Sequence, residues 1–356
     1  MKRLDKSLTI KKLIVIILLF NCTLIIFNCS RRFEPEPLQI SVRQNLALLQ
    51  SDPQFVMYLN FKKMRETDFW KKYISDSIFA SERNFGSFLN TLKTATGASI
   101  SNGIDELYFS NSWIGDNAMV IKGTFDKSKI NDYVKSDTNY AILPYPNNIG
   151  VYNNTALHFY FYFRDDFTIC ASNYLNQIES TLKITDTSGA GLLTNKDAIS
   201  TIENIKYKDN LWMMSTQKTF IRGIFENFTR MNKSGAPGGI QNDTSSVQDS
   251  ANGNGFNLSE LYRKISSVSF SLKMTDAIKL VMQNNCEDEN SAAGLKTRVE
   301  AMVALARLSA QFSKTKSSAI IKLLDKIDIT NDGKILFLET KIDPQQVEEI
   351  RRQKVF

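Results

Sequence analysis

The pattern with the most specific chemistry is a run of oxygen-bearing side chains near the C-terminus. Four residues match ligand positions of a calcium-binding loop: Asp328, Thr330, Asp332 and Glu339. Asp or Asn is preferred where Thr330 stands, and Pro344 interrupts the helix that should follow such a loop. The alternative is a β-hairpin that turns at Asn331-Asp332-Gly333. We expect the hairpin, and therefore no metal and no other cofactor.

Nucleophilic and acid–base chemistry has few candidates. The sequence holds one histidine, His158, and four cysteines, of which Cys22 and Cys29 lie in the N-terminal segment. Zinc sites and Ser–His–Asp or Cys–His arrangements are hard to build from this set. His158 falls in the aromatic run 157–163, where alternation predicts a half-exposed strand residue that shares a face with Tyr160 and Tyr162. We expect no enzyme and assign no catalytic residue.

Two further sets of reactive side chains have structural explanations. The acidic pair at 165–166 and the acidic triplet at 287–289 would suit a carboxylate-based hydrolase of envelope polymers, but both fall in turn regions. Solvated turn charges are the expected interpretation. Cys170 and Cys286 could form one bridge, yet two cysteines this far apart are more often small buried residues.

The N-terminus carries the most informative segment. A basic leader at 2–12 precedes the apolar stretch LIVIILLFNCTLIIF at 13–27. This is the plan of a secretory signal peptide, and its end at Ile26-Phe27-Asn28-Cys29-Ser30 resembles a bacterial lipobox. In such signals the cysteine becomes the lipidated first residue of the mature protein. We therefore expect a lipoprotein that carries its acyl chain, palmitate, on Cys29.

An uncleaved membrane helix is the main alternative. The uncharged run 13–30 has 18 residues, which is the threshold for spanning a bilayer. Arg31 and Arg32 follow it, and positive charge on the exported side opposes translocation. A lipid anchor, an uncleaved helix and plain cleavage all place the body outside the cytoplasm, in the bacterial cell envelope. We expect a signal or anchor at 1–28 and a tether at 29–47.

The amino-acid composition and net charge limit which classes of partner we expect. The chain of 356 residues is 42% hydrophobic, which is ample for a packed core. Its net charge of +7 includes five basic residues and one acidic residue in 1–28, so the rest holds 44 − 5 = 39 basic and 37 − 1 = 36 acidic residues. A balance of +3 gives no support for a nucleic-acid partner. The expected partners are the membrane and another envelope protein.

The sequence of the body predicts the same order of helices and strands twice, in units at 48–207 and 208–356. Each unit gives strand, helix, strand, strand, helix, strand, strand and helix. The strands are predicted at 55–59, 104–110, 118–124, 157–163 and 167–171, then at 211–214, 265–273, 277–283, 326–330 and 334–342. This predicts an α+β fold of two similar units in tandem, with largely antiparallel sheets and helices packed on one face. Residues 232–257, rich in Gly, Ser and Asn, predict a disordered insertion in the second unit.

The layout resembles that of bacterial envelope lipoproteins whose domains have no assigned function. The likeness covers 48–352 and is clearest at 48–59, at Gly123-Thr-Phe-Asp126 before a helix, and at 323–350. It implies a tandem α+β fold and no activity. Together with the N-terminal signal, it favours a membrane-anchored binding or scaffolding module. The alternatives are the carboxylate-based hydrolase and a calcium-stabilised adhesion module at Asp328.

Lipidation gives the first test. We expect Cys29→Ala to release the protein or to trap it as an unprocessed precursor, because the acylated thiol is lost. The wild type should incorporate labelled fatty acid, and the variant should not. Absence of label on the wild type, with an intact N-terminal peptide in mass spectrometry, would instead indicate an uncleaved helix.

Overall fold

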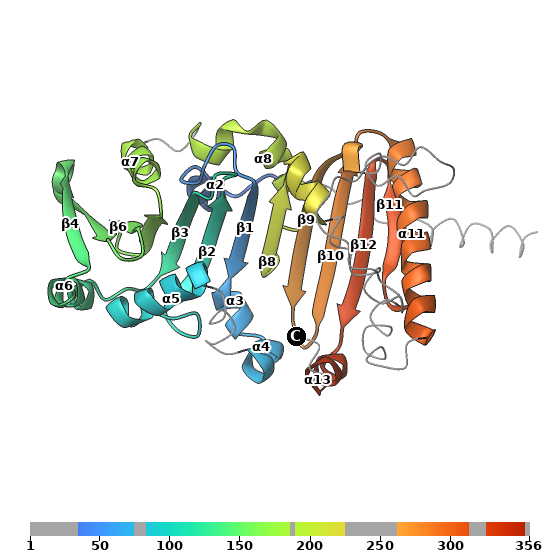
Figure 1. Ribbon diagram of the computed structural model, residues 1–356, viewed down its shortest axis with the longest axis horizontal. Helices are drawn as coiled ribbons and strands as arrows, with labels where there is room; N and C mark the ends of the chain where they lie inside the picture. The colour runs from blue at the N-terminus through green and yellow to red at the C-terminus, as the bar shows by residue number, and fades with distance from the viewer. Residues whose placement is uncertain (1–34, 75–82, 186–188, 225–261, 313–324, 353–356) are drawn as a thin grey trace, which may run out of the picture. The chain divides into compact units, whose positions relative to one another are not determined.

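The computed structural model describes residues 35–74, 83–185, 189–224, 262–312 and 325–352 (Figure 1). Cys29 and the predicted insertion at 232–257 lie outside these ranges. The chain divides into two compact units, 1–36 and 37–356. The second unit carries the sheet.

The described residues form an antiparallel sheet of twelve strands, which confirms the predicted α+β class. In chain order the strands are β1 (Phe55–Asn60), β2 (Ile104–Asn111), β3 (Asn117–Gly123), β4 (Tyr140–Tyr145), β5 (Ile149–Asn154), β6 (Phe159–Asp165), β7 (Thr168–Ser172), β8 (Leu211–Ser215), β9 (Ile265–Met274), β10 (Ile278–Cys286), β11 (Asp328–Asp332) and β12 (Ile335–Ile342). Their order in space is β11-β12-β10-β9-β8-β1-β2-β3-β7-β6-β5-β4.

Antiparallel pairing of β1 with β8 joins the two halves of the sheet. The register places Val56 opposite Met214 and Leu59 opposite Leu211. Outward from this pair, the order β1-β2-β3-β7-β6 matches the order β8-β9-β10-β12-β11. The two predicted units therefore contribute neighbouring halves of one sheet rather than two separate sheets.

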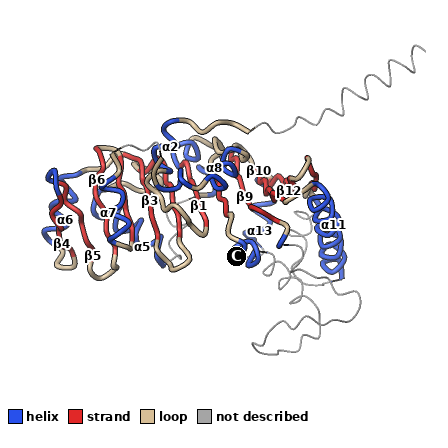
Figure 2. Tube along the Cα trace, turned by 90° about the horizontal axis from the view of Figure 1, so that it is seen from above, coloured by secondary structure: helices blue, strands red, loops and turns tan. Residues whose placement is uncertain are grey.

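Helices cover both faces of the first half of the sheet, which corrects the prediction that they pack on one face. The face that bears Met57 (the Met57 face) is covered by α3 (Phe61–Arg65), α4 (Asp68–Tyr73), α5 (Arg83–Thr96) and α6 (Lys127–Ser136). The face that bears Tyr58 (the Tyr58 face) is covered by α2 (Ile40–Leu46), α7 (Leu175–Lys183) and α8 (Lys196–Glu203). Figure 2 shows α2 and α8 on the opposite side of the strands from α5. Since β1 is apolar at successive positions, both of its faces need cover.

The second half has its described helices on the Met57 face. Residues 218–224 are helical, and α11 (Glu289–Phe312) lies beside β11 and β12 (Figure 1). Ile221, Val268, Leu295 and Leu336 share one buried cluster there. The last helix, α13 (Pro344–Arg352), meets α4, where the Tyr73 hydroxyl donates to the Pro344 carbonyl oxygen at 3.3 Å.

Capping residues in the sequence mark where some of the helices begin. Asp126 caps α6 as predicted, since its carboxylate accepts from the Ser128 and Lys129 amides. The stretch 61–73 forms two short helices rather than one, because Thr67 caps α4 through the Trp70 amide. Two strands, β4 and β5, were not predicted at all. Short 3-10 turns lie at Pro146–Asn148 and Gly191–Thr194.

Aromatic rings pack across the central strands on the Tyr58 face. The Tyr58 ring lies 4.7 Å from Tyr108 and 5.7 Å from Trp212, measured between centroids. Trp212 is fully buried, whereas Trp113, at the turn between β2 and β3, is 68% exposed. The two tryptophans thus form a matched pair for measuring how much packing at the centre of the sheet contributes to the free energy of unfolding.

We expect Trp212→Ala to lower the free energy of unfolding by about 3–5 kcal/mol, because it opens a cavity against Tyr58. Trp113→Ala should change it by no more than about 0.5 kcal/mol. Denaturant unfolding followed by circular dichroism measures both. Similar losses in the two variants would contradict the packing of Trp212 at the centre of the sheet.

Candidate functional site

The calcium-loop candidates lie on a β-hairpin, which confirms the predicted hairpin. Asp328 is paired with Glu339, and Asp332 with Ile335, so the turn is Gly333-Lys334 rather than Asn331-Asp332-Gly333. Along an extended strand, alternate residues lie about 6.6 Å apart, so Asp328, Thr330 and Asp332 do not wrap around a point. The Glu339 carboxylate instead lies 2.5 Å from the Lys279 ammonium group. Among the described residues, no group of three or more His, Cys, Asp or Glu side chains is placed to hold a metal ion.

The predicted strand position of His158 is wrong. His158 is exposed in the turn at 155–158, where its φ of 49° is left-handed. The expected aromatic alternation does hold beyond it. Tyr162 is buried on the Tyr58 face, where its hydroxyl donates to the Thr181 hydroxyl at 3.1 Å. Tyr162 is therefore a core residue and offers no surface to a ligand.

The two cysteines of the body are buried and unbridged, as expected. Cys170 lies on β7 and Cys286 on β10. Burial raises the pKa of each thiol to about 11, which keeps both protonated at neutral pH. A protonated, buried thiol is a poor nucleophile.

The acidic pairs serve turns and helix starts. The Asp166 carboxylate lies 2.6 Å from the Lys127 ammonium group, and this hydrogen bond lowers the pKa of Asp166. Asp288 accepts from the Ser291 amide at 2.7 Å at the start of α11, and this bond lowers the pKa of Asp288. Both groups are ionised and engaged in local structure, as expected of turn charges.

An apolar trough crosses the centre of the Met57 face. We define it by nine side chains: Met57, Phe109, Leu211, Met213, Phe270, Leu272, Leu280, Met282 and Leu338. One row of it runs in direct register across six strands, in the order Phe109, Met57, Met213, Phe270, Met282 and Leu338. Directly paired residues point to the same face, so these side chains lie side by side.

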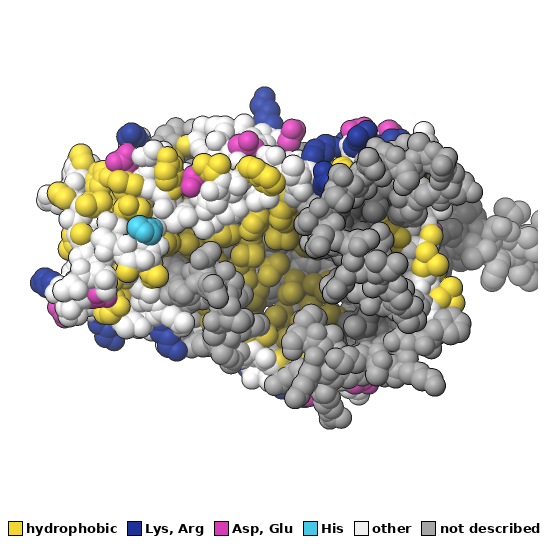
Figure 3. Space-filling model, in the orientation of Figure 1, with side chains coloured by type: hydrophobic (Ala, Val, Ile, Leu, Met, Phe, Trp, Pro, Cys, Tyr) yellow, Lys and Arg dark blue, Asp and Glu magenta, His cyan; other side chains and the backbone are white. Residues whose placement is uncertain are grey.

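The trough is partly open to solvent. All nine of its side chains are half-buried. Figure 3 shows hydrophobic side chains exposed on the floor of a hollow near the middle of this face. The helix-covered clusters of the two halves reach its borders, but Met213 and Leu280 belong to neither cluster. The floor therefore lies between two packed cores.

The nine side chains of the trough are all apolar, and Thr340, directly opposite Leu280, adds one hydroxyl at its border. Leu, Met and Phe offer no proton, no nucleophile and no charge. The strands beneath it, β2, β1, β8, β9, β10 and β12, each have a neighbour on both sides. Their backbone groups are thus engaged in the sheet, and an added strand has no edge to join. The surface can bind by burying apolar area and by little else.

Sequence patterns indicate the trough only weakly. FVMYLN on β1 and LWMMS on β8 are continuous apolar runs, which indicate strands buried on both faces. Which positions remain half-exposed depends on where the helices stop. The positions of the helix ends are set by contacts between residues that are distant in the sequence.

Comparisons with known proteins give only distant likenesses. No family model matches the chain, and no curated protein matches it. Crystal form III of TP0453 is similar with a TM-score of 0.47 and 9% identity over 86% of this chain and 97% of that one. Crystal form I of TP0453 gives 0.46 and 9% over 88% and 97%. At this level of similarity the matches assign no role to any residue.

An α-helix that spans a bilayer needs about 20 consecutive, mostly apolar residues. None of the described helices is both long enough and apolar enough to cross a membrane.

The hairpin can be tested against a calcium loop. Gly333 has a φ of +53°, which β-branched residues tolerate poorly, so Gly333→Val should cost about 1 kcal/mol or more. Glu339→Ala should cost no more than about 1 kcal/mol, since its pair with Lys279 is partly exposed. Millimolar calcium should leave the melting temperature unchanged.

A calcium loop would behave differently in the same melts. Ligand linkage would stabilise the fold by about 2.7 kcal/mol at calcium a hundredfold above its dissociation constant. A rise in melting temperature that Glu339→Ala abolishes would replace the hairpin with a metal site.

Proposed function

We propose that this protein is a non-enzymatic, membrane-anchored component of the cell envelope, and that its folded body is a binding module. The N-terminal signal with Cys29 supports the anchor. The apolar trough on the Met57 face supports the binding role, and it is the observation that carries the proposal. The ligand class that we propose for it is the acyl chain of a lipid.

The chemistry of the floor favours an acyl chain over a peptide. The nine side chains of the trough offer no hydrogen-bond partner, and Thr340 at its border offers a single hydroxyl. Most backbone groups of a bound peptide would therefore lose their contacts with water without replacement. An unsatisfied buried amide costs roughly 1–3 kcal/mol by protein measurements. An acyl chain has no such groups and gains about 0.8 kcal/mol for each buried methylene.

The dimensions also suit an extended chain. The row from Phe109 to Leu338 spans five strand spacings, or about 24 Å at about 4.8 Å per spacing. That is most of the roughly 30 Å hydrocarbon thickness of a bilayer. Three methionines, Met57, Met213 and Met282, lie in this row. Their unbranched side chains adapt to chains of different shape.

Polar substitution on the floor tests this proposal. We expect the double variant Met213→Gln/Leu280→Asn to weaken the binding of a fluorescent fatty acid at least about tenfold, because two amides would be desolvated by the bound chain. Fluorescence titration of the purified full chain measures the affinity.

Ile114→Gln is the matched control. Ile114 is 80% exposed at the turn between β2 and β3, away from the trough, so the affinity of this variant should equal that of the wild type. Denaturation midpoints establish that both variants are folded. Binding that does not saturate in the wild type, or that is equal in the trough variant, would remove the trough as the site.

A further inference from the structure

Three lysines stand in a row at one end of the Tyr58 face. Lys273 on β9 is directly opposite Lys279 on β10, and Lys279 is directly opposite Lys341 on β12. Directly paired side chains point to the same face and lie about 5 Å apart. Like charges in this arrangement destabilise a sheet. The fold thus maintains a row of exposed ammonium groups against their mutual repulsion.

More lysines reach the same place from the neighbouring loop and from α3. Asp209, just before β8, is within electrostatic range of four lysines: Lys63, Lys206, Lys273 and Lys279. Burial raises the pKa of Asp209, and these lysines act in the opposite direction. The Lys63 ammonium group also donates to the Lys208 carbonyl oxygen at 3.4 Å. The loop and the lysine row therefore form one surface.

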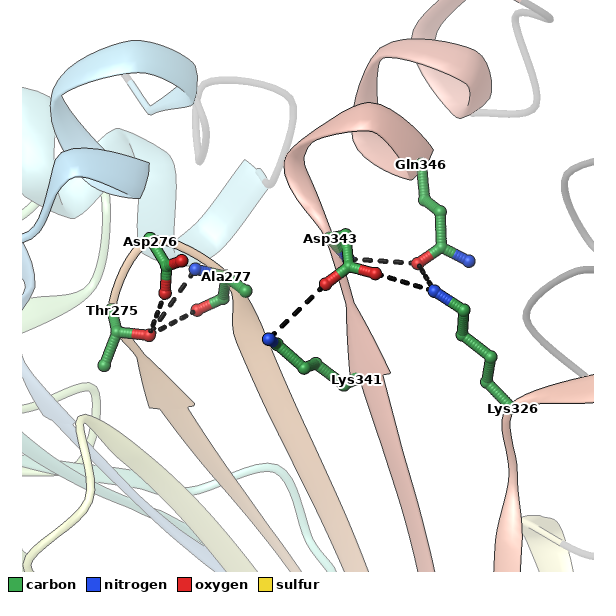
Figure 4. A network of polar contacts seen from close by, with 7 residues as sticks. All are labelled: Thr275, Asp276, Ala277, Lys326, Lys341, Asp343 and Gln346. Atoms are coloured by element: carbon green, nitrogen blue, oxygen red, sulfur yellow. Dashed lines mark hydrogen bonds and ion pairs between the residues drawn. The ribbon is translucent and has the colours of Figure 1, made fainter.

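Acidic side chains offset only part of this charge. Glu339 lies 2.5 Å from Lys279, and Asp343 is shared between Lys326 at 2.6 Å and Lys341 at 3.6 Å (Figure 4). A hydrogen bond from the Thr275 hydroxyl lowers the pKa of Asp276, in the turn between β9 and β10, and the positive charge of Lys341 lowers it further.

We call this surface the basic edge, and it comprises Lys63, Lys206, Lys208, Lys273, Lys279, Lys326 and Lys341. Five carboxylates lie on or beside it: Asp209, Asp276, Glu339, Asp343, and Glu106, which stands farther along the same row, opposite Asn60. The balance of the edge is therefore 7 − 5 = +2.

The chain enters the body beside the basic edge. The Tyr207 hydroxyl donates to the Pro37 carbonyl oxygen at 2.7 Å, and Tyr207 lies between Lys206 and Lys208 in sequence. Eight residue steps separate Cys29 from Pro37. A fully extended chain spans at most about 3.6 Å per residue, so Pro37 lies within about 29 Å of an anchored Cys29.

We propose that the basic edge contacts the anionic headgroups of the bilayer that holds Cys29. This inference rests on the proposed anchor. The short segment from Cys29 to Pro37 keeps the edge near the surface, and the excess positive charge of the edge complements anionic lipids. Basic side chains near such a surface are attracted to it within a Debye length, about 8 Å at physiological salt. The contact would orient the body on the membrane.

Vesicle partitioning tests the contact. The purified full chain is mixed with vesicles of phosphatidylcholine, with and without phosphatidylglycerol, at low and at high salt. We expect the wild type to prefer the anionic vesicles at low salt. The triple variant Lys273→Gln/Lys279→Gln/Lys341→Gln should lose this preference by about tenfold or more, as expected for the removal of three lysines at a surface.

A matched triple variant controls for net charge. Lys127, Lys129 and Lys135 on α6 are exposed, so changing them to Gln removes the same charge elsewhere. This control should keep the anionic preference. Equal losses in both triple variants, or no preference in the wild type, would overturn the proposal. So would binding of soluble polyphosphate by the basic edge without a preference for anionic vesicles, which would assign it to an acidic polymer.

The anchor is tested separately in the same samples. Fatty-acid label on Cys29 reports the anchor and does not depend on the lysines. Labelled protein without anionic preference would contradict the basic-edge contact alone. Unlabelled protein would contradict the proposed anchor.

Discussion

The antiparallel pairing of β1 with β8 is the constraint on which the rest of the structure depends. Each of these strands is the first strand of its half, and their ladder joins the seven strands of the first half and the five of the second into one continuous sheet. The ladder is held on the Tyr58 face by Tyr58 packed on Trp212. On the Met57 face the same ladder sets Met57 beside Met213. One pairing therefore creates both a closed aromatic core and the open centre of the trough.

The unequal cover of the two faces follows from how the halves differ. In the first half, α2, α7 and α8 close the Tyr58 face over apolar residues such as Val120 and Cys170. In the second half, the same face bears Ser269, Ser271 and Gln283 on neighbouring strands. These three residues are buried, and a polar atom of each has no hydrogen-bond partner among the described residues. Buried polar groups of this kind are commonly satisfied by water. Buried polar residues thus stand on this face in the second half where the first half has apolar ones.

The order of the elements could be predicted from the sequence better than their arrangement. Periodicity and turn residues act over a few residues, so they located β1, β2 and β3, and the segment ending at Asp126 located the start of α6. The β4 strand was missed because YAILPY contains a proline, which is tolerated here on the edge strand of the sheet. The β5 strand, IGVYNN, was missed because Gly and Asn are depleted in strands. Helix placement failed for a different reason. An apolar run shows that a strand is buried, but not which face a distant helix will cover. The trough and the basic edge were missed for the same reason, since Lys63 and Lys279 are brought near Asp209 only by the folded sheet.

The trough and the lysine row lie on opposite faces of the sheet, so binding and attachment would take place on separate sides of the body. Lys273 and Ser271 share a face with Trp212, whereas Leu272 shares the other face with Leu211. A body held at the bilayer through its lysines would turn the Met57 face away from the headgroups. An acyl chain in the trough would then arrive from the aqueous side rather than slide in from the membrane beneath. The twelve-stranded sheet would act as a partition, with electrostatic attachment on one face and apolar binding on the other. Because the β1–β8 ladder fixes which residues point to each face, the same pairing that builds the sheet also separates these two surfaces.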